Sequence, residues 1–325
     1  MQVVETFGQY VQRWSGSHPD RARDLLRLGW EAQNLKNKYL PDRRLLPADQ
    51  YLAKIMMDAM LKPLQHPASS AIVSVFTPSE ILQEAGLNPY NVEGFSCYLS
   101  GSRAERLFLQ QAENAGISET LCSYHKTFLG AADKDVPSDL VTPLYSGMVN
   151  NILLGSQQVE NYVDRLRADI EKAPPARGKR IYWMHTIPFW SAAARQAPAF
   201  SEKAQIVGCE LSQVCEPDFD PEEPFEAMAY RMVNHVLNGS GLRRIEAGIR
   251  HAKEAGADGV VWFNHWGCKH TLGAAQLAKK KFEEHGLPLL ILDGDGCDRS
   301  HGGEGQTSTR LEAFLEMLEE GDGTL

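Results

Sequence analysis

The stretch "GVVWFNHWGCKHTLGAAQLAKKKFEEHGLPLLILDGDG", residues 259–296, decides the fold. It begins with an apolar run rich in β-branched and aromatic residues, continues into a segment with helical spacing that Gly286 ends, and closes with a second apolar run. Continuous apolar runs separated by a helix are typical of parallel strands that are covered on both faces. We therefore predict a strand–helix–strand unit within a parallel sheet.

The same alternation continues on both sides of this unit. Apolar runs at 180–187 and 204–211 predict two more strands. Helical spacing predicts helices at 191–204, 225–239, 242–256 and 308–321. Strands that alternate with helices in this way are typical of a doubly wound domain. We assign residues 179–325 to this domain.

The first half of the chain begins with a helical segment. Residues 1–66 carry apolar side chains at three-to-four spacing. The run "AIVSVF" (71–76) then predicts a buried strand, and "TPSEILQEAG" predicts a helix with Thr77 as its N-cap and Glu80 in the capping-box position. A further helix is expected at 100–116.

A loop and a connector are expected after these elements. Residues 131–145 predict a loop, and residues 155–179 predict a helix that runs into a Pro, Gly and Lys linker. We therefore expect a first α/β domain at 67–145 and a helical connector at 146–178.

Composition and charge limit the class of protein. The net charge is -9, with 43% hydrophobic residues, and no basic patch interleaved with aromatic residues occurs. This argues against a nucleic-acid or anionic-membrane surface, because both require clustered positive charge. No apolar run of about 18 residues occurs, and the first residues lack the pattern of a signal peptide. The expected location is the cytoplasm.

The chain contains six cysteines, at Cys97, Cys122, Cys209, Cys215, Cys268 and Cys297. They lie far apart and form no CxxC pair, so in a reducing compartment they indicate buried thiols, or metal or redox chemistry, rather than a disulfide framework. A zinc ribbon and a thioredoxin-type site are disfavoured for the same reason. We expect Cys209 and Cys215 to be buried small side chains.

Ligands of open α/β sheets bind outside the carboxyl ends of the strands. Cys268 lies there, after a predicted strand and before a helix N-terminus, whose partial positive charge favours a thiolate. Cys122 has His125 and Lys126 close behind it. An alternative interpretation is that both cysteines are buried side chains that only fill space in the core, since cysteine is among the most buried residue types. Glu80 is either a helix-stabilising residue or an acid–base carboxylate.

Several segments together resemble the 2-hydroxyacyl-CoA dehydratase family, which includes related benzoyl-CoA reductase subunits and double-cubane cluster reductases. They are "FTPSEILQEAG", "LCSYHKTFLGA", "VDRLRADI", residues 259–300 and "EGQTSTRLEAFLEMLEE". The resemblance covers most of the chain from about residue 70. It implies two flavodoxin-like, Rossmann-like parallel-sheet domains and a [4Fe–4S] cluster held by three cysteines.

Two of these three cysteines correspond to Cys122 and Cys268. The family's middle cysteine has no counterpart, because the chain passes from "VPSDLVT" directly to "PLYSGMVNNILLGS" and no cysteine lies between Cys122 and Cys209. The first domain is therefore truncated relative to the family. Cys97 and Cys297 are further candidates for the third ligand.

The resemblance also implies a function. It is the radical elimination of water from an (R)-2-hydroxyacyl-CoA to give a 2-enoyl-CoA, a hydro-lyase reaction, after one-electron activation by an ATP-dependent iron–sulfur activator protein. The implied assembly is an oxygen-sensitive heterodimer with a homologous second subunit, and Glu80 is the implied catalytic carboxylate. The alternatives are a related ATP-dependent reductase subunit and a non-catalytic scaffold subunit without a cluster. A zinc enzyme is disfavoured.

Overall fold

The computed structural model describes residues 2–43, 47–74, 77, 79–135, 140–141, 161, 164–165, 168–169, 171–172, 178–186, 203–212, 224–301 and 304–321. The chain divides into two compact units. The first comprises Met1–Asn114, Thr127–Pro174 and Glu216–His235, and the second comprises Ala115–Lys126, Pro175–Cys215 and Val236–Leu325. Each unit is thus assembled from three separate stretches of chain.

The first unit begins with the predicted helical segment, which the structure confirms. It consists of α1 (Gln2–Ser17), α2 (Pro19–Tyr39) and α3 (Pro47–Gln65). The break between α1 and α2 falls at Pro19, which begins α2 because its missing N–H needs no partner in a first helical turn. Buried side chains of these helices, including Trp30 and Met60, pack into one core with Phe95 and Phe128.

A parallel three-stranded sheet follows in the first unit. Its strands are β1 (Ser70–Val73), β2 (Asn88–Asn91) and β3 (Leu140–Val141), in the order β2-β1-β3. The remaining helices are α4 (Ser79–Glu84), α5 (Val92–Gly101), α6 (Glu105–Asn114), α11 (Pro224–Asn234) and α7 (Ser123–Asp135), of which residues 123–126 belong to the second unit. The sequence did not predict β2, since it contains Pro89. An edge strand tolerates a proline because one side of it needs no ladder hydrogen bonds.

The predicted loop at 131–145 is wrong at both of its described ends. Residues 131–135 continue α7, and Leu140–Val141 form β3. The helix continues because Tyr124, Phe128 and Ala131 recur at helical spacing and are all buried. The rest of this loop, most of the predicted connector at 146–178 and most of the predicted helix at 191–204 lie outside the described residues.

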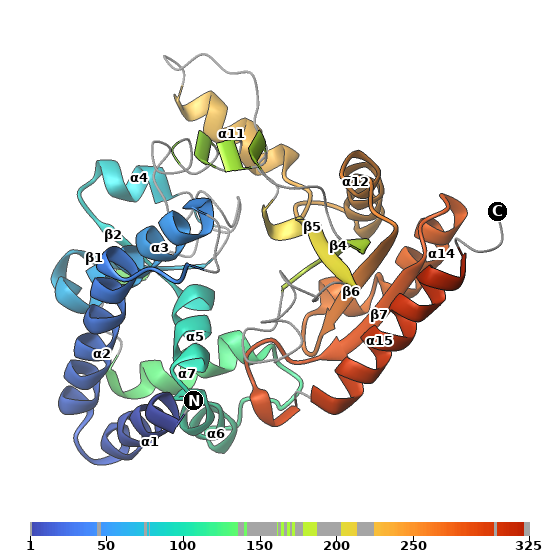
Figure 1. The fold of residues 1–325 in the computed structure, drawn as a ribbon. Coiled ribbons are helices and arrows are strands. Elements are labelled where there is room, and N and C mark those ends of the chain that lie inside the picture. Colours follow the sequence, from blue (N-terminus) through green and yellow to red (C-terminus); the bar gives the residue numbers. More distant parts are fainter. Residues whose placement is uncertain are drawn as a thin grey trace. The chain divides into compact units, whose positions relative to one another are not determined.

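The second unit contains the predicted four-stranded parallel sheet (Figure 1). Its strands are β4 (Lys179–Met184), β5 (Ala204–Cys209), β6 (Gly259–His265) and β7 (Leu289–Gly294), in the order β5-β4-β6-β7. All neighbouring pairs are parallel, which confirms the expected α/β class. The central strand β6 is buried along its full length.

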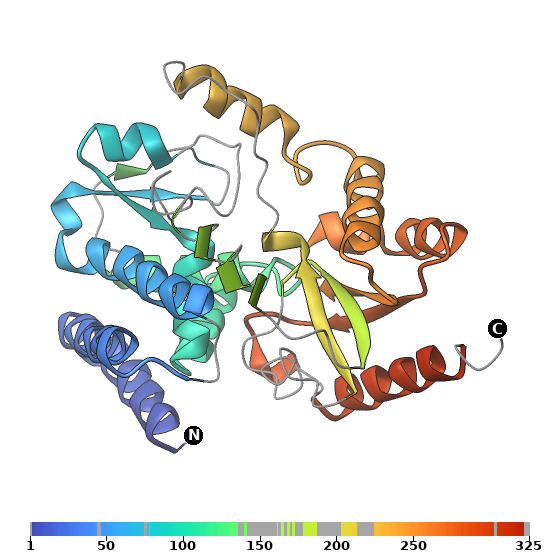
Figure 2. The ribbon, with the colours of Figure 1, turned by 45° about the horizontal axis from the view of Figure 1, so that its top comes forward.

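Helices cover both faces of this sheet. They are α12 (Gly241–Glu254), α13 (Lys269–Leu272), α14 (Ala275–Glu284) and α15 (Glu304–Gly321). Tyr182 and Trp262 pack with α12 and α14, whereas their neighbours Trp183 and Phe263 pack with α15 on the opposite face. Figure 2 shows α15 on one side of the sheet and α12 on the other. Successive strand residues point to opposite faces, so a strand buried on both faces must be apolar at every position.

The predicted helix that Gly286 ends, whose helical spacing covers residues 272–286, is divided in the structure. The single turn of α13 ends at Leu272, with Gly273 as its C-cap, and α14 begins at Ala275. Across the described residues, no helix combines the length and the apolarity that a membrane span would require.

Candidate functional site

The four strands of the second sheet each end in, or next to, an ionisable side chain. His185 follows β4, Glu210 follows β5, His265 ends β6 and Asp295 follows β7. Because parallel strands share one carboxyl edge, these four side chains come to the same edge of the sheet. The sequence alone did not mark these four residues as a set, although an ionisable residue near the end of each apolar run is visible in it.

Cys268 lies at this edge, as the N-cap residue of α13. Its backbone carbonyl accepts hydrogen bonds from the N–H groups of Thr271 and Leu272 and from the hydroxyl of Thr271. The thiol is half-buried. The turn of α13 therefore holds the backbone of Cys268 in place while its side chain remains partly accessible.

Gly267 brings the loop before Cys268 into contact with Cys122. Gly267 has a φ of 78°, in the left-handed region that favours glycine. A Cβ added there would lie 2.5 Å from the backbone nitrogen of Cys122 and 2.7 Å from its Cα. Only a glycine allows the two backbones to approach so closely. The two thiol-bearing segments, 146 positions apart in the chain, are thereby placed next to each other.

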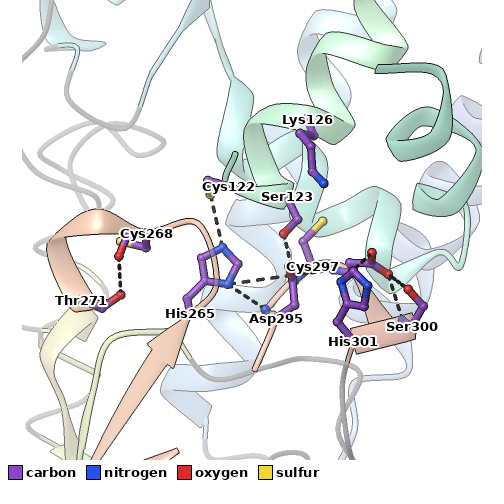
Figure 3. Close-up of polar contacts among 12 residues, drawn as sticks. Cys122, Ser123, Lys126, His265, Cys268, Thr271, Asp295, Cys297, Ser300 and His301 are labelled. Carbon is purple, nitrogen blue, oxygen red and sulfur yellow. Dashed lines mark hydrogen bonds and ion pairs between the residues drawn. The ribbon is translucent and has the colours of Figure 1, made fainter. Parts of the chain in front are cut away.

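The thiol of Cys122 contacts an imidazole. Its Sγ lies 3.3 Å from Nε2 of His265 (Figure 3). Burial alone would raise the pKa of Cys122, but hydrogen bonds and charge from His125 and His265 outweigh it and lower the pKa to about 6. Near neutral pH this thiol is therefore mostly a thiolate, which is the form that binds metals and attacks electrophiles.

The orientation of the His265 ring is also determined. The backbone N–H of Gly296 donates to Nδ1 of His265 at 3.0 Å. An N–H can only donate, so Nδ1 is the acceptor and the ring proton lies on Nε2. Nε2–H then donates to the sulfur of Cys122. This loop after β7 thus fixes the tautomer that stabilises the thiolate.

Asp295 connects the Cys122 segment to the loop after β7 by hydrogen bonds. Its Oδ1 accepts a hydrogen bond from the Ser123 hydroxyl at 2.5 Å, and further bonds from the backbone N–H groups of Cys297 and Asp298 at 2.8 and 2.7 Å (Figure 3). The carboxylate is buried. It holds a residue next to Cys122 against the loop that orients His265.

A second polar cluster lies at the same edge of the sheet. Arg244 and Glu210 form a buried ion pair with two hydrogen bonds of 2.6 and 2.5 Å. The remaining guanidinium nitrogen of Arg244 lies 2.9 Å from Nδ1 of His270. Glu210 also accepts a hydrogen bond from the backbone N–H of His185, whose φ of 72° is uncommon for a residue other than glycine.

The two histidines of this cluster are held in their neutral form. Burial, followed by the nearby Arg244 guanidinium, holds the pKa of His185 well below its ordinary value. The same two causes, in the same order, lower the pKa of His270, although Glu210 partly offsets them. The cluster therefore adds neutral imidazole groups, and no free positive charge, to the edge of the sheet where the thiols lie.

The other predicted site residues lie as follows. Cys297 is buried in the loop after β7, in the second unit. Cys97 is half-buried on α5, in the first unit. Cys209, which we expected to be buried, is half-buried at the end of β5, because this strand lies at the edge of the described sheet. Glu80 lies on α4, and its side chain is outside the described residues, as is Cys215.

The donor set fits an iron–sulfur cluster in part. Thiolates are the ligands that iron–sulfur clusters use, and Cys122 and Cys268 supply two of them on adjoining backbones. Within the described ranges, no group of three or more histidine, cysteine, aspartate or glutamate side chains is arranged to hold a metal ion. The described residues therefore fit two ligand positions and do not complete a set of three.

A groove of about 870 Å³ lies elsewhere in the second unit. It is lined mainly by apolar residues of α15 and of the loop before β7, including Leu287, Phe314 and Met317. This places it at the amino-terminal edge of the sheet, opposite to the thiols. The position of the candidate site thus follows from the cysteines and their polar neighbours.

The fold and these residues define a class: an α/β protein with two cysteines on adjoining segments at the carboxyl edge of a doubly wound sheet. The family model described as "2-hydroxyglutaryl-CoA dehydratase, D-component" matches residues 142–318, which is more than half of the chain. The chain belongs to this family. A search of curated proteins found no match. The family assignment confirms the resemblance seen in the sequence.

Proposed function

We propose that this chain is one subunit of an iron–sulfur 2-hydroxyacyl-CoA dehydratase. The reaction removes water from an (R)-2-hydroxyacyl-CoA: hydroxide leaves C2, a base takes a β-proton, and a 2-enoyl-CoA forms. An ATP-dependent activator protein supplies one electron, which is returned at the end of the turnover. A homologous second subunit completes the enzyme, and the proposed compartment is the cytoplasm.

The observation that carries the proposal is the close approach of the loop before Cys268 to the backbone of Cys122. Gly267 places the two segments in contact, and the lowered pKa of Cys122 favours the thiolate that iron requires. We propose these two thiolates as ligands of a [4Fe–4S] cluster, with Cys97 and Cys297 as candidates for a third. Such a cluster, when bound, supplies one-electron transfer and a Lewis-acidic iron.

The surrounding residues have supporting roles in this proposal. His265 stabilises the Cys122 thiolate through its Nε2–H, and Asp295 holds the adjoining Ser123. Hydrogen bonds to a ligand sulfur tune the redox potential of a cluster, so His265 is a positioning and tuning residue. Glu80 remains the proposed carboxylate for proton transfer.

The test measures iron and sulfide after anaerobic purification and reconstitution. We expect brown protein in the wild type, and loss of most of the iron in Cys122→Ala and in Cys268→Ala. Cys209→Ala is the matched control, since Cys209 is half-buried at the same edge of the sheet. It should retain the iron of the wild type.

The same experiment separates the alternatives. If neither Cys122→Ala nor Cys268→Ala changes the iron content, both thiols are structural and the scaffold function is favoured. If iron is bound, turnover of (R)-2-hydroxyglutaryl-CoA with the second subunit and the activator distinguishes a dehydratase from a related reductase. Loss of iron in Cys97→Ala or Cys297→Ala identifies a further ligand.

A further inference from the structure

A chain of hydrogen bonds, separate from the thiols, joins Glu210, Arg244 and His270. The Arg244 side chain is fully buried, and two of its N–H groups are held by the Glu210 carboxylate. Its third contact is with Nδ1 of His270 at 2.9 Å. A guanidinium can only donate hydrogen bonds, so Nδ1 of His270 is the acceptor and the ring proton lies on Nε2. This chain of hydrogen bonds therefore determines the tautomer of His270.

The Nε2–H of His270 has no acceptor within the part of the chain that the structure describes. Nε2 is buried, and it has no hydrogen-bond partner among the described residues. Other buried polar atoms of the same unit share this condition within the described chain, among them Nδ1 of His185, Oγ1 of Thr186 and Oδ1 of Asn264. Buried polar atoms are nearly always paired, so an unpaired buried donor indicates that a bound molecule supplies its partner. For His270 that molecule must offer an acceptor.

The position of His270 limits what this acceptor is. His270 lies two residues after Cys268, within the single turn of α13. In the proposed function, the group that reacts beside this thiol is the acyl-CoA thioester, whose carbonyl oxygen is an acceptor. We propose that the Nε2–H of His270 donates a hydrogen bond to this thioester oxygen, an inference that rests on the proposed function.

This contact stabilises the step that makes the reaction possible. When the thioester takes up the electron from the activator, negative charge develops on its carbonyl oxygen. A fixed N–H donor binds that charged oxygen more strongly than the neutral one, so it lowers the barrier rather than only improving substrate binding. The proton stays on Nε2 throughout, and no bond to His270 forms or breaks. Arg244 and Glu210 are positioning residues that act through His270.

The first test uses the complete enzyme, reconstituted with its second subunit and activator. In His270→Ala we expect kcat with (R)-2-hydroxyglutaryl-CoA to fall about 100-fold, the effect of losing one oxyanion donor, while KM changes by less than about fivefold. His270→Gln keeps an N–H and should recover part of this loss. Iron content should be that of the wild type in both. The control is His285→Gln, because His285 is exposed at the end of α14.

A second measurement does not depend on turnover. It compares, by calorimetry, the Kd of an acyl-CoA thioester with that of the thioether analogue that lacks the carbonyl oxygen. Wild type and His285→Gln should prefer the thioester, and His270→Ala should lose this preference. Equal preference in His270→Ala and wild type, or no thioester binding by the wild type, overturns the inference. If the preference is lost as expected but the wild type dehydrates no substrate, the proposed function fails and the contact stands.

Discussion

Cys122 illustrates what single residues contribute to this protein. The backbone N–H of Gly296 orients one imidazole, and that imidazole, with His125, lowers the pKa of the thiol from 9.0 to about 6. A group whose pKa is lower in the folded state binds fewer protons than it does in the unfolded chain. The stabilisation that the lowered pKa of Cys122 gives the folded state is therefore complete above pH 9 and is lost as the pH falls through 6.

The change His265→Ala tests this arrangement in the metal-free protein. Without the Nε2–H donor, we expect the pKa of Cys122 to rise by about one unit or more, since hydrogen bonds to a charged form favour that form. The measurement is the rate of iodoacetamide alkylation of the Cys122 peptide against pH, followed by mass spectrometry. The midpoint should lie near pH 6 in the wild type and in the exposed-residue control His285→Ala. An unchanged midpoint in His265→Ala would show that His265 does not stabilise the thiolate.

Gly267 provides a second test at the residue scale. Gly267→Ala combines a left-handed backbone with a collision against Cys122, whereas Gly286→Ala has a similar φ of 74° and nothing within 4 Å of the added Cβ. We expect Gly286→Ala to cost about 1 kcal/mol of unfolding free energy and Gly267→Ala at least about 2 kcal/mol more. Urea denaturation measures both. Equal costs would mean that the close approach to Cys122 is not maintained in solution.

Of the site, the sequence predicted the two cysteines and the edge of the sheet where Cys268 lies. It did not predict the contact between Cys122 and His265, which are 143 positions apart. Nor did it predict the ion pair of Glu210 with Arg244. Charged residues are rarely buried unless they are paired, so their burial cannot be known until the partner is known.

Among the secondary-structure elements, α15 is held by its apolar face. Leu311, Phe314, Leu315 and Leu318 are buried and pack against the sheet, whereas Met317 on the same helix is 48% exposed. Helical spacing places the first four residues on one side. This face was visible in the sequence because the pattern is local.

The pair Leu315→Ala and Met317→Ala measures the packing of this helix. Leu315→Ala should lower the free energy of unfolding by about 2–5 kcal/mol, because it removes buried surface and leaves a cavity. Met317→Ala should change it by less than about 1 kcal/mol, since much of this side chain already contacts water. Urea titrations of both variants supply the values. Similar costs would indicate that α15 presents a different face to the sheet.

Local patterns did not predict β2 or the end of α7, and the reasons can be identified. β2 contains a proline, which suits an edge strand but weakens its signal. The end of α7 was taken for a loop because residues 131–139 are mostly small or charged. Its helical state depends on burial of Phe128 and Ala131 against side chains from other parts of the first unit.

At the scale of the whole chain, each unit is built from non-adjacent segments. Residues 115–126 belong with the second unit, in which Ser123 is bonded to Asp295. Within that unit β6 pairs on both sides and is fully buried, whereas β5 is an edge strand of mostly intermediate burial. Stability should therefore differ between strands of the same sheet.

Hydrogen exchange followed by mass spectrometry checks this order. Amides of β6 should exchange at least about 10-fold more slowly than those of β5, because β6 opens only when both neighbouring strands or the helical layers are displaced. The comparison is internal to one protein sample and needs no variant. Protection of β5 equal to that of β6 would place β5 inside the sheet and contradict the observed strand order.

The sequence by itself determined the class of fold, the four strands of the second half, and the family. These depend on periodicity and motifs within short windows, which are readable without knowing any partner. Only the tertiary structure decided that Gly267 touches Cys122, that His265 donates to its thiol, and that Arg244 orients His270. Such contacts join residues at the ends of different strands. They depend on sheet order and on the close approach of backbones, which no local pattern encodes.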